Sequence, residues 1–137
     1  MQGKQALTGV RVLDLSGTIA GAVAGMLFGD YGAEVVHFAP PTWTQAGELP
    51  GLAVWHRNKI CSSADWHSDS DVDAVRELLA GADICITSDD TTCAKLGIDV
   101  GGFGKLIHLH MPTCVPLESG GLDVDNLLAA ASGMALR

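Results

Sequence analysis

Two short clusters in the sequence combine residue types that suit an anionic ligand. The first is the turn Ser16-Gly17, which separates an apolar run beginning at Val10 from a stretch of small residues. A glycine turn lets the backbone approach a phosphate closely, and the start of the helix that follows attracts negative charge. The second cluster, His56-Arg57-Asn58-Lys59, places two cations on an acidic chain. Such cations donate charge-assisted hydrogen bonds to phosphates, although a solvated loop is the simpler interpretation.

Three further candidates give weaker signals. The turn lacks G-x-G-x-x-G, and residues 37–39 (His-Phe-Ala) stand where a dinucleotide site needs an acidic residue, so nicotinamide chemistry is not expected. His108 and His110 share one face of an expected strand, which could form half of a metal site. No third ligand follows at short spacing, so we expect no metal. Asp89-Asp90 is interpreted as the cap of a short helix.

The elements that must position these residues alternate between strands and helices. A strand from Val10, a helix over 18–30 and a strand over 33–38 form a βαβ unit, which places nucleotide-like ligands at the turn after its first strand. Residues 42–69 hold all three Trp residues without a helical period and are expected to be irregular. The later expected elements are a helix capped by Asp69 or Ser70 and ended by Gly81, a strand over 82–87, a helix over 91–96, a strand over 106–111 and a helix from Asp123.

Glycines recur every four residues along the first expected helix. Each glycine weakens a helix by roughly 1 kcal/mol relative to alanine, so a stripe of them needs a compensating reason. Close packing of the helix against a sheet or another helix is the first interpretation, and approach of a ligand is the alternative for the members nearest the turn. The stripe consists of Gly17, Gly21, Gly25 and Gly29.

Composition excludes several classes of function. The net charge of −8 argues against nucleic acid as a partner. No apolar run reaches the roughly 20 residues of a membrane helix, and no signal peptide precedes the first strand. A hydrophobic content of 47% with 18% charged residues indicates apolar surface that a partner or further chain covers. Four widely spaced cysteines predict a reduced, cytoplasmic protein; they are Cys61, Cys85, Cys93 and Cys114.

Several segments, in register, resemble the family III CoA-transferases, the group that contains formyl-CoA transferase, carnitine CoA-transferase and α-methylacyl-CoA racemase. Residues 7–16, Leu-Thr-Gly-Val-Arg-Val-Leu-Asp-Leu-Ser, look like the family opening L-x-G-x-R-V-L-D-L-S, and residues 32–41 look like its G-A-E-V-I-K-V-E-x-P. Residues 56–61 are similar to N-R-x-K-R-S, residues 82–88 to A-D-V-x-V-x-N, and residues 124–133 to the helix Y-D-x-x-x-Q-A-x-S-G.

The resemblance implies an α/β fold: a Rossmann-like three-layer domain with a mainly parallel sheet, here a single domain over residues 1–137 that is incomplete at its C-terminus. It also implies that CoA or acyl-CoA is the ligand, that no metal is needed, and that full-length chains form homodimers. In the family, CoA lies across the turn after the first strand and the basic loop. The matching positions of this sequence are Gly17, Ala20, Arg57, Asn58 and Lys59.

Some family positions differ here. His37 and Ala39 replace a lysine and a glutamate at the end of the second strand, and Val124 stands where the racemases have a general-base histidine. The aspartate nucleophile of the transferases lies beyond the last matching helix, so we assign no catalytic residue and expect no transferase activity from this chain alone.

Two hypotheses follow. One is a CoA-binding N-terminal fragment of a transferase, which retention of residues 57–59 favours. The other is a degenerate module for folding or dimerisation, which the changes at His37 and Ala39 favour.

Overall fold

The computed structural model describes residues 5–39, 52–98 and 104–112 of the 137-residue chain. Strands and helices alternate along these residues, as a βαβ architecture requires. The elements are β1 (Arg11–Asp14), α1 (Ile19–Asp30), β2 (Glu34–Ala39), α2 (Leu52–Trp55), β3 (Lys59–Ser63), α3 (Asp69–Ala80), β4 (Ile84–Thr87), α4 (Asp90–Leu96) and β5 (Ile107–His110).

The strands form one parallel sheet in the order β3-β2-β1-β4-β5. The chain winds outward from β1 in one direction through β2 and β3, and in the other through β4 and β5. The order therefore reverses between β1 and β4, and the turns that follow these two strands flank the place where ligands of such sheets bind. In the register, Asp14 lies opposite His37, and Thr87 lies opposite His110.

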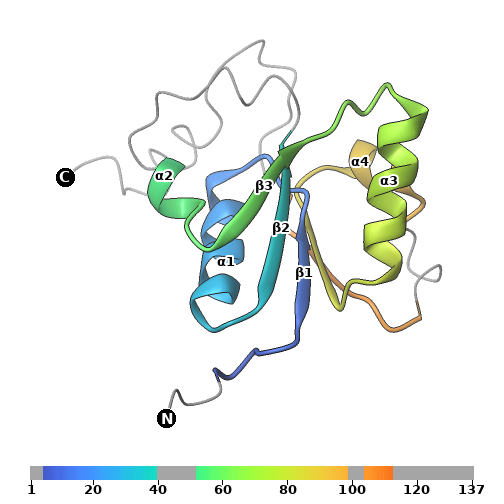
Figure 1. The fold of residues 1–137 in the computed structure, drawn as a ribbon. Coiled ribbons are helices and arrows are strands. Elements are labelled where there is room, and N and C mark those ends of the chain that lie inside the picture. Colours follow the sequence, from blue (N-terminus) through green and yellow to red (C-terminus); the bar gives the residue numbers. More distant parts are fainter. Residues whose placement is uncertain (1–4, 40–51, 99–103, 113–137) are drawn as a thin grey trace.

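Helices cover both faces of the sheet and make three layers (Figure 1), with α1 and α2 on one side and α3 and α4 on the other. Alternate residues of each strand face opposite helices. Val12 and Ile86 belong to the core cluster on the α1 side, whereas Leu13 and Cys85 belong to the larger cluster that contains Val75 and Leu79 of α3. The polar side chains at the strand ends therefore divide between two faces.

Side chains and glycines set the helix boundaries. Thr18 caps α1 by accepting a hydrogen bond from the Gly21 N–H at 3.2 Å. Asp89 caps α4 in the same way, because its Oδ1 accepts from the Thr92 N–H at 2.6 Å. The expected cap at residues 89–90 is therefore confirmed. Gly81 ends α3, also as expected, but the N-cap position of α3 is held by Ser68, so the expected cap at Asp69 or Ser70 is wrong by one or two residues.

The α/β class, the βαβ unit and the mainly parallel sheet are confirmed. The expectation that residues 42–69 are irregular is wrong in part, because Lys59–Ser63 form strand β3 and Leu52–Trp55 form α2. β3 is an edge strand whose side chains face solvent for most of its length, so it lacks the apolar alternation by which strands are recognised. Cys114 lies outside the described residues, and so does the helix that is expected to begin at Asp123. Within the described ranges, no helix is both long and apolar enough to span a membrane.

Candidate functional site

A buried carboxylate lies directly beneath the turn after β1. Asp14 is the last residue of β1, and its side chain is 0% exposed. Its Oδ1 accepts hydrogen bonds from the Ser16 backbone N–H at 3.1 Å and from the Ser16 hydroxyl at 2.6 Å. A carboxylate that accepts both bonds fixes the backbone of the turn two residues further along the chain. Asp14 therefore determines the shape of the turn that the sequence singles out as a ligand site.

Two cationic residue types face the other oxygen of Asp14. Lys59 of β3 donates from Nζ to Asp14 Oδ2 at 2.9 Å and to the Ala22 carbonyl of α1 at 2.8 Å. Nδ1 of His37, from β2, lies 3.2 Å from the same Asp14 oxygen. The Lys59 and Asp14 side chains are both 0% exposed. The cluster thus joins β1, β2, β3 and α1 through one ion pair that is removed from water.

The electrostatics of the cluster favour an ionised Asp14. Burial opposes ionisation, but the hydrogen bond and charge of His37, the charge of Lys59 and the bond from Ser16 outweigh it and hold the pKa of Asp14 below its ordinary value. The His56 ring lies 4.7 Å from the His37 ring, centroid to centroid. Burial, together with the nearby charges of His37 and Lys59, lowers the pKa of His56, which favours its neutral form.

The glycine stripe of α1 makes this arrangement possible. A Cβ at Gly21 would lie 2.0 Å from Ser16 Oγ, and a Cβ at Gly25 would lie 2.7 Å from Asp14 Oδ2 and 2.8 Å from Lys59 Nζ. A Cβ at Gly29 would lie 3.1 Å from Asn58 Cβ. The expected close packing is confirmed, and its partners are the turn, the ion pair and the start of β3.

The turn itself lies at the reversal of strand order. The Gly17 N–H donates to the hydroxyl of Ser88, which follows β4, at 3.0 Å, so the two turns that flank the reversal are joined. Ala20 is exposed in the first turn of α1, and that turn contains no acidic residue. Gly17 and Ala20 are therefore both present at the positive end of a 12-residue helix.

Arg57 and Asn58 lie at the opposite end of α1. Arg57 donates from Nε to Asp30 Oδ1 at 3.0 Å and from Nη2 to Oδ2, and Asn58 donates from Nδ2 to Asp30 Oδ1 at 2.9 Å. The hydrogen bond from Arg57 is the main reason that the pKa of Asp30 is lowered. Because Asp30 ends α1 and Ala20 lies in its first turn, about 15 Å of helix separates the two groups at 1.5 Å per residue.

Sequence reasoning missed two members of the buried cluster. In the sequence, Asp14 is recognised only as part of the opening motif, and His37 only as a departure from the second motif. Neither observation predicts that the two side chains meet. A signal was present, because Asp14 is the one ionisable residue within the run Val12-Leu13-Asp14-Leu15, and a charge in a buried strand requires a partner. The register that brings Asp14 beside His37 and Lys59 is a tertiary property.

Comparison with known proteins agrees with the geometry. The sequence profile of CoA-transferase family III matches residues 7–103. The CoA-transferase/lyase DddD of Marinomonas sp. is 36% identical over an alignment of 119 positions that covers 81% of this chain and 14% of that protein. The bile acid CoA-transferase BaiK of Clostridium scindens is 34% identical over 95 residues, 67% of this chain and 22% of that protein. The chain thus spans less than a quarter of the length of either relative.

Solved structures show the same likeness. A hypothetical protein from Mycobacterium tuberculosis superimposes with a TM-score of 0.72 and 26% identity, over 95% of this chain and 40% of that one. A CAIB/BAIF family protein from Brucella suis gives a TM-score of 0.67 and 25% identity, over 78% of this chain and 33% of that one.

Proposed function

This chain belongs to CoA-transferase family III, and from that membership we propose that it supplies the CoA-binding N-terminal region of an acyl-CoA transferase. The observation that carries the proposal is the turn after β1. It stands at the reversal of strand order, it is held by Asp14 from below, and it opens onto the start of α1. A ligand with phosphates fits that combination, because backbone N–H groups and the helix dipole both favour negative charge there.

The predicted CoA contacts divide between the two ends of α1. Gly17 and Ala20 provide close approach at its start, where we place a phosphate of CoA. Arg57 and Asn58 provide a second contact at its far end, which suits an extended ligand. Arg57 is 44% exposed and directs Nε and Nη2 toward Asp30. A guanidinium has five N–H donors, so it retains capacity for an anion.

Lys59 has a different role in this proposal. Its ammonium group is enclosed and bonded to Asp14 and Ala22, so we assign it to holding the turn and not to contacting CoA directly. A buried ammonium that moved to a ligand would leave the Asp14 carboxylate without its counter-charge, which is costly.

We further propose that this chain binds CoA without transferring an acyl group by itself. Covalent transfer through a carboxylate needs an oxygen that can reach a thioester. Asp14, the carboxylate that bonds the turn, is fully buried, and its oxygens are engaged by Ser16, Lys59 and His37. Its geometry is that of a structural anchor.

The experiment is a calorimetric titration of the 137-residue chain with free CoA at low salt. Ala20→Glu is the informative variant, because a carboxylate in the first turn of α1 suits the helix dipole yet repels a phosphate at the same place. Ala20→Gln is its matched neutral control. We expect saturable binding that weakens at least tenfold in Ala20→Glu and much less in Ala20→Gln. Arg57→Gln tests the second contact and is expected to weaken binding severalfold.

Three results would each contradict part of the proposal. Absence of saturable heat at millimolar CoA would remove CoA as the ligand. Binding that is equal in Ala20→Glu and Ala20→Gln would place CoA away from the turn. Acyl transfer in the chain alone, followed with an acyl-CoA donor and a carboxylate acceptor, would refute the assignment of binding without transfer.

A module for dimerisation is the second candidate, and exposed apolar side chains favour it. Large hydrophobic residues on α1, α2 and the edge strand β3 are about half exposed. Such residues gather where a partner or further chain covers the surface. They are Leu27 at 48%, Tyr31 at 59%, Val54 at 52% and Ile60 at 60% exposure. We expect concentration-dependent self-association in analytical ultracentrifugation that Ile60→Lys weakens; a monomer at every concentration would contradict it.

The chemistry of the cysteines supports a reducing compartment. Cys61 is exposed, Cys85 is buried and Cys93 is partly buried, and all three are free thiols. We therefore propose a cytoplasmic location, which localisation of a tagged chain would test.

A further inference from the structure

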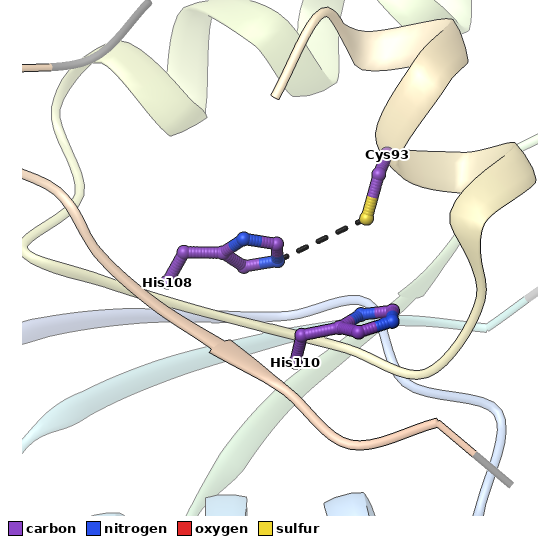
Figure 2. A group of neighbouring side chains, drawn as sticks. All are labelled: Cys93, His108 and His110. Carbon is purple, nitrogen blue, oxygen red and sulfur yellow. Dashed lines mark hydrogen bonds between the residues drawn. The ribbon is translucent and has the colours of Figure 1, made fainter. Parts of the chain in front are cut away.

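A second polar cluster also lies at the carboxyl ends of the parallel strands, but on the face of the sheet that α3 and α4 cover. β5 places His108 and His110 on one side of the strand, and α4, which follows β4, holds Cys93 above them (Figure 2). One ligand atom from each of the three residues lies within 4.8 Å of the others. Sequence reasoning found the two histidines but not Cys93, because 15 residues separate Cys93 from His108.

We propose that Cys93, His108 and His110 form a binding site for a divalent cation of the zinc class. A thiolate with two imidazoles is a donor set that zinc favours, and three protein ligands leave a fourth position open. Tetrahedral zinc places neighbouring donor atoms about 3.3–3.6 Å apart, given its bond lengths. Cys93 Sγ lies 3.8 Å from His108 Nε2, so this pair of donor atoms needs to approach by only a few tenths of an ångström.

The outer contacts orient the imidazoles for this role. Nε2 of His110 lies 3.3 Å from a carboxylate oxygen of Asp90, and its Nδ1 faces the interior of the cluster, 2.9 Å from the Thr87 hydroxyl. A metal-binding histidine commonly donates its other ring N–H to a carboxylate, which selects the tautomer. His108 Nε2 also lies beside the Thr87 hydroxyl, at 2.7 Å. That hydroxyl or a water is available for the fourth position.

Cation binding at the cluster is an exchange of a proton for a metal ion. The cation displaces the thiol proton of Cys93 to solvent as the metal–sulfur bond forms, and nothing is oxidised or reduced. The His108 side chain is exposed, so an ion can enter from solvent.

The test measures Zn²⁺ and Co²⁺ binding to the full 137-residue chain. We expect one ion per chain, a thiolate-to-cobalt charge-transfer band, and release of about one proton, obtained from titrations in buffers of different ionisation enthalpy. Cys93→Ser abolishes the charge-transfer band, and His110→Ala weakens zinc binding at least tenfold. Asp90→Asn weakens it about tenfold while leaving all three ligands in place.

Cys61→Ser is the matched control, because Cys61 is an exposed thiol on β3, at the far edge of the sheet. It is expected to bind zinc as the parent chain does. The thermal midpoint of the parent chain, but not of Cys93→Ser, should rise with added zinc, and circular dichroism shows that each variant is folded. Absence of stoichiometric binding, or binding that survives Cys93→Ser, would overturn the site. The cluster would then be a set of hydrogen bonds around Thr87.

Discussion

Replacement of Lys59 by methionine tests whether the buried cluster holds the fold together. The change keeps an unbranched side chain of similar length but removes the charge that faces Asp14 Oδ2 at 2.9 Å. Because both side chains are 0% exposed, the variant leaves a buried carboxylate without its lysine partner. Removal of one member of a buried ion pair costs about 3–5 kcal/mol. For a domain of this size that corresponds to a fall in Tm of roughly 10–20 °C.

Arg57→Met is the matched control, because it removes the neighbouring cation from an exposed pair. Arg57 and Asp30 are 44% and 27% exposed, and water screens the attraction in such a pair, so its loss should cost far less than loss of the buried pair. The assay is chemical denaturation followed by circular dichroism, with the free energy of unfolding compared among the parent and both variants. Equal losses in Lys59→Met and Arg57→Met would refute the reasoning, since they would show that burial does not distinguish the two pairs.

A double variant separates loss of the charge pair from loss of packing. Asp14→Asn removes the negative charge but retains a side-chain oxygen for the Ser16 bonds. In the Lys59→Met background it is expected to recover about 1–3 kcal/mol, because it removes a buried negative charge that has lost its lysine partner and retains His37 beside it. No recovery would mean that Lys59 acts through its packing alone.

The pH dependence has a definite sign. The folded-state pKa of Asp14 lies below its ordinary value of 3.8, so its ionisation stabilises the fold above that value. The contribution is lost as the pH falls from 3.8 through the lower folded pKa. In Lys59→Met one attraction that lowers the pKa is absent. The difference in free energy of unfolding between the parent chain and Lys59→Met should therefore be smaller at pH 3 than at pH 7. Chemical denaturation at the two pH values measures this difference.

Two smaller predictions concern the glycine stripe and the thiols. Gly21→Ala should destabilise the fold by about 1–3 kcal/mol in denaturation, although alanine favours helices, because its Cβ would lie 2.0 Å from Ser16 Oγ. Gly104→Ala, with no atom within 4 Å of its Cβ, should be nearly neutral. Burial raises the pKa of the buried Cys85 thiol to about 12, whereas Cys61 is exposed. A thiol reagent at pH 7.5 should therefore label Cys61 in the folded chain and Cys85 only on unfolding, as mass spectrometry would show.

The sequence predicted those elements whose patterns are local. The βαβ unit over residues 10–38 combines a buried apolar strand, a glycine turn and a capped helix, and each of these is written in neighbouring residues. The sequence does not predict β3, because this strand forms by pairing with β2, some twenty residues earlier in the chain. Most side chains of β3 itself face solvent. Pairing of an exposed edge strand leaves almost no periodic signal.

The candidate site shows the same division. Gly17 follows from the local pattern of a strand, a turn and a helix, whereas Ala20 follows from the family resemblance. The positions of Asp14, His37 and Lys59 depend on the register among three strands. The position of Cys93 beside His108 depends on how α4 packs against the sheet near β5. Residue type alone suggested that Lys59 faces an anionic ligand. The anion that it meets is a carboxylate of its own chain.

This distinction decides how binding data on the loop are to be interpreted. If a Lys59→Ala variant failed to bind CoA, the usual interpretation would be that Lys59 contacts a phosphate of CoA. Here the same loss follows if the variant releases Asp14 and the Ser16-Gly17 turn with it, since that turn is fixed by the ion pair from below. Ala20→Glu avoids the ambiguity, because Ala20 is exposed and takes part in none of the hydrogen bonds described for the cluster. A loss of CoA affinity in Ala20→Glu with an unchanged free energy of unfolding can arise only at the binding surface.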